Sequence, residues 1–183
     1  IEALQNGKIP IYEPGLEDLV HRNMRSGRLR FSTQFQDWIP DADLIFIAVG
    51  TPTRRGDGHA DLKYVYAAAA QIAAHLEGYT IIVDKSTVPV GTAREVKRVI
   101  HQANPTADFD VASNPEFLRE GAAIGDFKRP DRIVIGTDDE WARDVMREVY
   151  RPLFLNQAPI QFTSRRSAEL IKYAANAFLA TKI

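Results

Sequence analysis

One uninterrupted apolar run constrains this chain more than any other feature. Residues 44–49 read Leu-Ile-Phe-Ile-Ala-Val, and Gly50, Thr51 and Pro52 follow directly. A strand that is apolar at every position is typical of a sheet whose two faces are both covered by helices. The run therefore predicts a strand buried on both faces of an α/β sheet, with its carboxyl end at the Gly-Thr-Pro turn.

Segments with strand and helix patterns alternate along the rest of the chain. Further strands are predicted at residues 29–32, 80–83, 109–112, 132–136 and 160–162, the last of them at a sheet edge. Helices are predicted over residues 1–6, 62–76, 96–103 and 140–151, and from about Arg165 to Ile183. We expect Gly7 to end the first of these helices, and a capping box at residues 137–140 to begin the fourth. This alternation predicts a Rossmann-like, doubly wound parallel sheet.

Composition excludes several classes of function. Lys and Arg total 23 and Asp and Glu total 24, so a formal net charge of -1 provides no footprint for nucleic acid or an acidic membrane. The chain has no cysteine, which excludes a disulfide scaffold and a thiol nucleophile within these residues. The four histidines lack metal-ligand spacing, and no apolar run approaches the roughly 20 residues of a membrane span. We therefore expect no metal and no membrane partner, and we expect a cytoplasmic protein.

Three successive predicted strands end in polar turns. These turns are residues 49–53, 85–92 and 114–121, and they are rich in hydroxyl side chains, prolines and carboxylates. Any one of them is more simply read as an ordinary turn. Because the carboxyl ends of parallel strands meet at one edge of a sheet, three such turns together favour a ligand site there.

Two glutamates in the third turn are four residues apart. If Pro115 opens a helical turn, the carboxylates of Glu116 and Glu120 lie on one face. They could then divide a general-base role from a ligand-contact role. The alternative is an ordinary helix N-terminus, where acidic side chains are favoured by the helix dipole.

The last predicted helix has a polar stripe formed by Glu169, Lys172 and Asn176. The opposite, apolar face comprises Ile171, Ala174, Ala175 and Phe178. Periodicity alone favours a stripe that faces solvent. The functional alternative is that Lys172 and Asn176 direct an ammonium and an amide at one oxygen, as an oxyanion requires.

Six segments together carry a resemblance to a known family. They are residues 9–16, 49–53, 85–89, 114–121, 130–132 and 169–178, which span almost the whole chain. In this order they resemble the UDP-glucose/GDP-mannose dehydrogenase family. Residues 114–121, Asn-Pro-Glu-Phe-Leu-Arg-Glu-Gly, are more similar to the UDP-glucose branch.

The resemblance implies an enzyme that oxidises the C6 alcohol of a UDP-sugar to a carboxylate while reducing two molecules of NAD. It implies an NAD site lined by Val49, Gly50, Thr51, Pro52, Thr53, Ser86, Thr87, Val88 and Glu120. It implies a substrate site lined by Glu116, Phe117, Leu118, Arg119, Glu120, Lys172 and Asn176. Thr87 would hold a water or the reacting hydroxyl, and Glu116 would be the general base in hydrolysis of a thioester. Lys172 and Asn176 would stabilise the oxyanion.

The resemblance also implies a domain organisation. Residues 1–164 would be a partial NAD-binding domain without its first βαβ unit, and residues 165–183 would begin a central interdomain helix. The UDP-binding domain and the nucleophilic cysteine would lie beyond Ile183. We therefore expect an internal fragment, inactive alone, of a homodimer or larger homo-oligomer.

Two alternatives remain open at this stage. One is a sister enzyme that acts on GDP-mannose or a UDP-N-acetylhexosamine. The other is a noncatalytic, flavodoxin-like interaction module, although no acidic triad follows the predicted strands.

Overall fold

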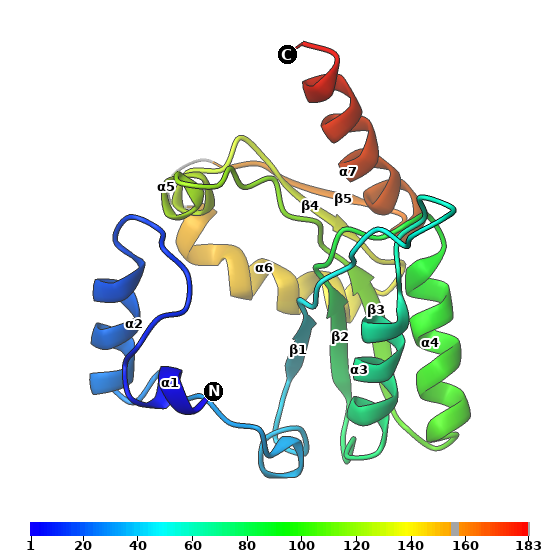
Figure 1. Cartoon of the computed structure of the whole chain (residues 1–183). Coiled ribbons are helices and arrows are strands. Elements are labelled where there is room, and N and C mark those ends of the chain that lie inside the picture. Colours follow the sequence, from blue (N-terminus) through cyan, green and yellow to red (C-terminus); the bar gives the residue numbers. More distant parts are fainter. Residues whose placement is uncertain (155–157, 183) are drawn as a thin grey trace.

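In the computed structural model, a five-stranded sheet forms the centre of the described part of the chain, residues 1–154 and 158–182 (Figure 1). The strands lie in chain order: β1 (Leu44–Ile47), β2 (Thr80–Asp84), β3 (Phe109–Ser113), β4 (Ile133–Gly136) and β5 (Ile160–Thr163). β1, β2 and β3 are parallel, as are β4 and β5. The predicted α/β sheet is therefore confirmed, with β5 at an edge.

The prediction of an entirely parallel sheet is wrong at one junction. β4 pairs with β3 in the antiparallel sense, through Ser113 and Gly136 at their carboxyl ends. Between these strands lies only one short helix, α5 (Ala123–Lys128). Because the chain does not return to the amino end of β3 on a long helix here, β4 starts beyond the carboxyl end of β3 and runs back toward it. The two strands therefore pair only at their last residues.

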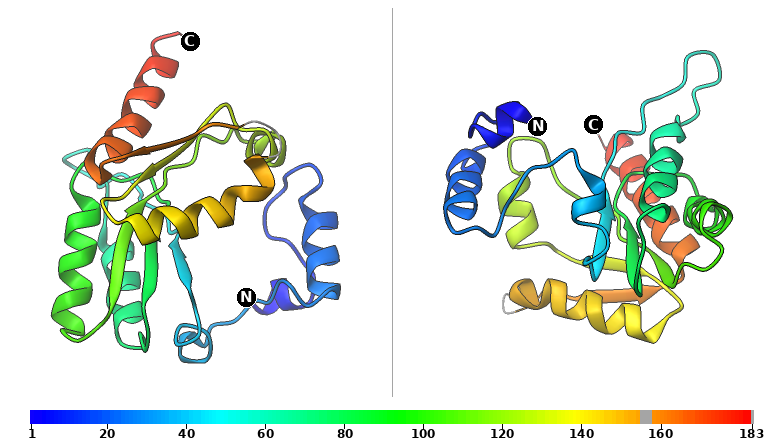
Figure 2. Two further views of the ribbon diagram at one scale, coloured as in Figure 1. Left: turned by 180° about the vertical axis from the view of Figure 1, so that it is seen from behind. Right: turned by 90° about the horizontal axis from the view of Figure 1, so that it is seen from below.

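Helices cover both faces of the sheet. α3 (Lys63–Ala73) and α4 (Thr92–Ala103) lie on one face, and α6 (Glu140–Phe154) lies on the other (Figure 2). α7 (Arg165–Ala180) projects beyond one end of the sheet (Figure 1). The remaining elements are α1 (Glu2–Gln5), α2 (Leu16–Arg25) and a 3-10 turn at Phe35–Asp37. The Glu13 carboxylate ties the segment before α2 to α5, because it accepts hydrogen bonds from the N–H groups of Gly121 (2.9 Å) and Ala123 (2.8 Å).

The core consists of two apolar clusters separated by the sheet. Alternate residues of β2 point to opposite faces, so Ile82 packs with α3 and α4 while Ile81 and Val83 pack with α6. β2 and β4 are buried at every position. β1 is not, because it lies at the sheet edge and Phe46 is 37% exposed, so the predicted burial of this run on both faces is wrong for the described residues.

Several predicted boundaries also differ. Residues 29–32 form no strand, since they join no ladder of the sheet. α6 is capped by Asp139, which accepts from the Ala142 N–H at 2.7 Å, rather than by a box that begins at Thr137. It continues past Pro152 to Phe154, because a proline in the last turn removes only one helical hydrogen bond. The end of the first helix is confirmed, with Gly7 in the left-handed region at φ 77°.

Candidate functional site

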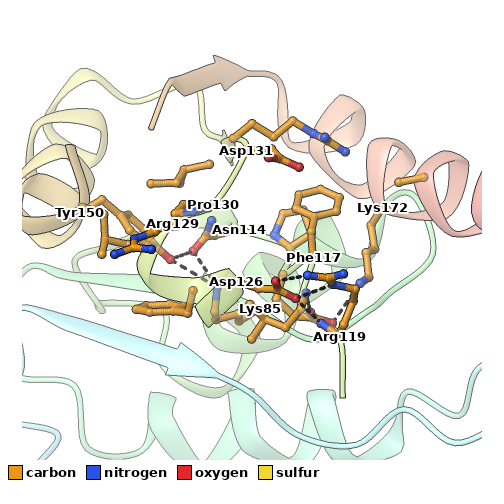
Figure 3. Close-up of a pocket in the computed structure, with 18 of the residues that line it drawn as sticks. Lys85, Asn114, Phe117, Arg119, Asp126, Arg129, Pro130, Asp131, Tyr150 and Lys172 are labelled. Atoms are coloured by element: carbon orange, nitrogen blue, oxygen red, sulfur yellow. Dashed lines mark hydrogen bonds and ion pairs between the residues drawn. The ribbon is translucent and has the colours of Figure 1, made fainter. Parts of the chain in front are cut away.

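A cavity of about 580 Å³ opens beside the carboxyl ends of β2 and β3 (Figure 3). The loop after β3, α5, the start of β4, α6 and α7 all contribute to its wall. The structure brings together here six of the seven predicted substrate residues, Glu116, Phe117, Leu118, Arg119, Lys172 and Asn176. Glu120 is exposed and is not part of the lining.

An ion pair joins two of these residues across 56 positions of sequence. Lys172 Nζ donates to Glu116 Oε1 at 2.9 Å, and Lys172 is only 7% exposed. The second oxygen of Glu116 accepts from the Leu118 N–H at 2.6 Å. Burial opposes the charge on Glu116, but these two donors outweigh it and hold the pKa of this carboxyl below its ordinary value. The pair thus presents an ionised carboxylate and a cation to the same cavity.

The first half of the polar stripe of α7 is buried, which is the reverse of what periodicity favours. Glu169 is 3% exposed and Lys172 is 7% exposed, whereas Phe178 is 71% exposed. The first half of the stripe is buried because each side chain finds a polar partner on another element. Asn176 is exposed but lines the cavity, one turn beyond Lys172.

The proposed helical pairing of Glu116 and Glu120 is wrong. Residues 114–119 are not helical, and α5 begins only at Ala123. Side-chain bonds hold this loop in its irregular form: Asn114 Nδ2 donates to Val134 O at 2.8 Å, and Arg119 pairs with Asp126 at 2.7 Å. Such side-chain bonds compete with the helical pattern, so spacing in the sequence misleads here.

The two loops predicted to bind NAD lie side by side. Ser86 Oγ accepts from the Val49 N–H (3.0 Å) and donates to the Val49 carbonyl (2.8 Å), and Thr51 Oγ1 donates to Thr87 O (2.9 Å). Thr87 is on this neighbouring loop and does not line the cavity. Within residues 1–154 and 158–182 the Thr87 hydroxyl has no protein partner, and Gly50 has open space around it. The open backbone and this hydroxyl fit a polar, extended cofactor such as NAD.

Three further residues of the cavity were given no individual role from the sequence. Lys85 Nζ donates to Asn114 Oδ1 and to the Tyr150 hydroxyl, each at 3.3 Å, and Tyr150 itself donates to Asn114 Oδ1 (Figure 3). Burial lowers the pKa of Lys85 to about 8 and raises that of Tyr150 to about 12. Lys85 and Asn114 directly follow β2 and β3 and begin two of the polar turns that the sequence indicated. Tyr150 has no such signal, because only the packing of α6 brings it here.

The described residues contain neither a metal-binding cluster nor a membrane-spanning helix. No three or more side chains of ligand type are grouped so as to hold a metal ion in this part of the chain. Nor does any helix of the described residues have the length and apolar character needed to cross a bilayer.

The family model and two relatives that match this chain all belong to one family of dehydrogenases. Residues 1–154 match the family model for the UDP-glucose/GDP-mannose dehydrogenase family, NAD binding domain. A curated UDP-glucose 6-dehydrogenase of Rhizobium meliloti is 66% identical over all of this chain and 42% of its own length. A second, YwqF of Bacillus subtilis, is 52% identical over all of this chain and 41% of its own length. The chain thus spans about two fifths of the length of these relatives.

Solved structures agree with the sequence matches. A UDP-glucose dehydrogenase from Pyrobaculum islandicum superposes with a TM-score of 0.94 at 46% identity, over all of this chain and 42% of that one. A GDP-mannose dehydrogenase from Pseudomonas aeruginosa superposes with a TM-score of 0.93 at 38% identity, over the same shares. Both superpositions therefore cover the whole of this chain.

Proposed function

The chain belongs to the UDP-glucose/GDP-mannose dehydrogenase family, and we propose that the protein containing it oxidises UDP-glucose to UDP-glucuronate. In this reaction the C6 alcohol loses four electrons to two molecules of NAD, and water supplies the second carboxylate oxygen. The single observation that carries the proposal is the Lys172–Glu116 pair, which places a cation and a base in one cavity. The named activity of the 66% identical relative supports the choice of substrate.

Charge in the cavity suits both halves of this reaction. The Lys172 ammonium, with the Asn176 amide one turn further along α7, would stabilise an oxygen that gains negative charge. Because the pKa of Glu116 lies below its ordinary value, this side chain is ionised at neutral pH and would accept a proton from the attacking water. The chain has no cysteine, so a thiol that carries the intermediate as a thioester would come from outside these residues.

The two loops joined by Ser86 would hold NAD, which accepts hydride when bound. We propose that residues 49–53, together with Ser86, Thr87 and Val88, contact it mainly through backbone groups and hydroxyls. Thr87 would hold a water or the reacting hydroxyl, since its own hydroxyl has no protein partner within the described residues. Glu120 is exposed, and its proposed contact with cofactor and substrate stays a prediction.

The organisation of the whole protein is part of the same proposal. Residues 1–164 would belong to the NAD-binding domain, and residues 165–183, of which Ile183 lies outside the described residues, would begin a central helix. The exposed apolar residues Leu170 and Phe178 on α7 support a homodimer or larger homo-oligomer. A cytoplasmic location also stays a prediction.

The experiment is an assay of NADH formation by the complete protein with UDP-glucose, GDP-mannose and UDP-N-acetylmannosamine. We expect turnover with UDP-glucose, and we expect Lys172→Ala to lower kcat by roughly 100-fold because it removes stabilisation of the oxyanion. Lys8→Ala, at an exposed lysine that is not part of the cavity lining, is the matched control and should leave kcat unchanged. Preference for another sugar would assign the protein to a sister activity, and absence of NADH with all three would refute the proposal.

A further inference from the structure

The carboxyl group of Glu169 is buried outside the cavity and takes no part in the chemistry proposed above. It is 3% exposed, and its two oxygens accept hydrogen bonds from the N–H groups of Gly91 (2.6 Å) and Ala93 (2.8 Å). These donors are the N–H groups of the N-cap residue and of the second residue of α4. Glu169 itself belongs to α7, 76 and 78 positions away in sequence.

α4 needs this cap because it cannot provide its own. A helix leaves its first N–H groups without partners inside the helix, and a side chain at the N-cap position usually accepts from one of them. Here the N-cap is Gly91, which has no side chain and adopts φ 101°. A carboxylate is well suited to the positive end of a helix dipole, so Glu169 acts as a cap supplied by another helix.

The bond joins two parts of the proposed active site. On one side, Gly91 ends the loop that carries Ser86 and Thr87 and that is fastened to Val49. On the other side, Lys172 follows Glu169 by one helical turn and pairs with Glu116. The loop and the ion pair are therefore linked through a single buried carboxyl group.

We propose that Glu169 is a positioning residue, which sets the placement of the Lys172 ammonium relative to the loop that bears Thr87. This inference rests on the proposed function, because it assigns both ends of the link to one reaction. Reactivity depends steeply on such placement, since a displacement of about 1 Å can reduce a rate by about 100-fold.

If Glu169 only stabilised the docking of α7, its loss would release the helix from the sheet. The first turn of α7 has other anchors: Arg165 donates to Val111 O at 3.2 Å and pairs with Asp138 at 2.8 Å. Gly136 also packs so closely beneath this turn that an added Cβ would lie 2.7 Å from Ala168 Cβ. Because these anchors remain, loss of the Glu169 cap should shift α7 and the loop without undocking the helix.

The kinetic test is a double-mutant cycle in the complete protein. We expect Glu169→Gln, which turns an amide donor toward a backbone donor, to lower kcat by roughly 10- to 100-fold with little change in KM for either substrate. In a Lys172→Ala background the same substitution should lower kcat by less than about threefold, because the group it positions is already gone. The matched control is Glu148→Gln on the exposed side of α6, which should leave kcat unchanged in both backgrounds. Equal effects in the two backgrounds would overturn the proposal.

A second measurement does not depend on activity. We expect hydrogen–deuterium exchange in Glu169→Gln to increase both in residues 85–93 and in residues 172–176, whereas Glu148→Gln should change neither segment. An increase confined to residues 85–93 would mean that Glu169 only caps α4, and would overturn the proposal even if the true substrate is not UDP-glucose. If Glu169→Gln does not fold, Glu169→Asp keeps the charge but is too short to reach both donors, and it should give the same two exchange changes.

Discussion

Asp84 is a buried acid whose removal should stabilise the protein in a pH-dependent manner. It ends β2, is 2% exposed, and has one oxygen without a hydrogen-bond partner in the described structure. Its other oxygen accepts from the Ser86 N–H at 3.2 Å. Burial, reinforced by the nearby Glu169, raises the pKa of Asp84 to about 7 from an ordinary value of 3.8.

The direction and size of the effect follow from this shift. Between about pH 4 and pH 7 the unfolded chain releases the Asp84 proton while the folded chain keeps it, so the free energy of unfolding falls as pH rises. Above about pH 7 both states are ionised and the loss is complete. The rise of this pKa from 3.8 to about 7 corresponds to about 4 kcal/mol of unfolding free energy, of which about 3 kcal/mol is lost between pH 5 and pH 8.

Asp84→Asn tests this reasoning, because asparagine keeps the acceptor for Ser86 but cannot ionise. Urea unfolding followed by circular dichroism at pH 5 and pH 8 should show a gain over the wild-type protein that is about 3 kcal/mol larger at pH 8. Asp41→Asn, at an exposed aspartate, is the control and should show no such difference. The same gain at both pH values would refute the argument, since it would mean that Asp84 is ionised in the folded protein throughout.

Two further substitutions test the packing around the site. Gly136→Ala should destabilise the protein by about 1–3 kcal/mol in urea unfolding, because the new Cβ would lie 2.7 Å from Arg165 Cα and 2.8 Å from Ser164 O. The control is Gly78→Ala, which has open space around it and should leave the free energy of unfolding unchanged. Tyr150→Phe should lower the free energy of unfolding by about 1 kcal/mol in the same assay, because Lys85 and Asn114 lose a buried hydroxyl partner. Tyr12→Phe, at a 90% exposed position, is the control and should leave it unchanged. An unaffected Gly136→Ala would show that α7 is not closely docked on β4, and an unaffected Tyr150→Phe that this hydroxyl is not held in the buried network.

Local patterns were sufficient for most elements of the sheet. Short apolar runs predicted β2, β3, β4 and β5 to within a residue or two, and the apolar spacing before Asn104 predicted the end of α4. These strands could be recognised because most of their positions are apolar and buried, and this apolar character is visible within each segment. The turns after β1, β2 and β3 likewise pointed to one sheet edge, and Glu116 and Lys172 do meet there.

Other features depended on partners far away in sequence. The amphipathic pattern of α7 favoured exposure of Glu169 and Lys172, but the α4 N-terminus and Glu116 bury them. The spacing of Glu116 and Glu120 suggested a helix, but bonds from Asn114 and Arg119 to other elements hold that loop open. A pattern records the polarity of a side chain, not whether a distant segment offers it a hydrogen bond.

The sequence by itself thus determined the fold class, most strand and helix positions, and which turns contain the polar chemistry. Only the tertiary structure decided that β1 lies at the sheet edge, that β4 runs antiparallel to β3, and that Lys85, Asn114 and Tyr150 share one network. The physical reason is that the apolar periodicity that predicts a strand or helix is a property of that segment alone. A charged or polar group can be buried only where another group forms a hydrogen bond or an ion pair with it, and tertiary folding brings that group close.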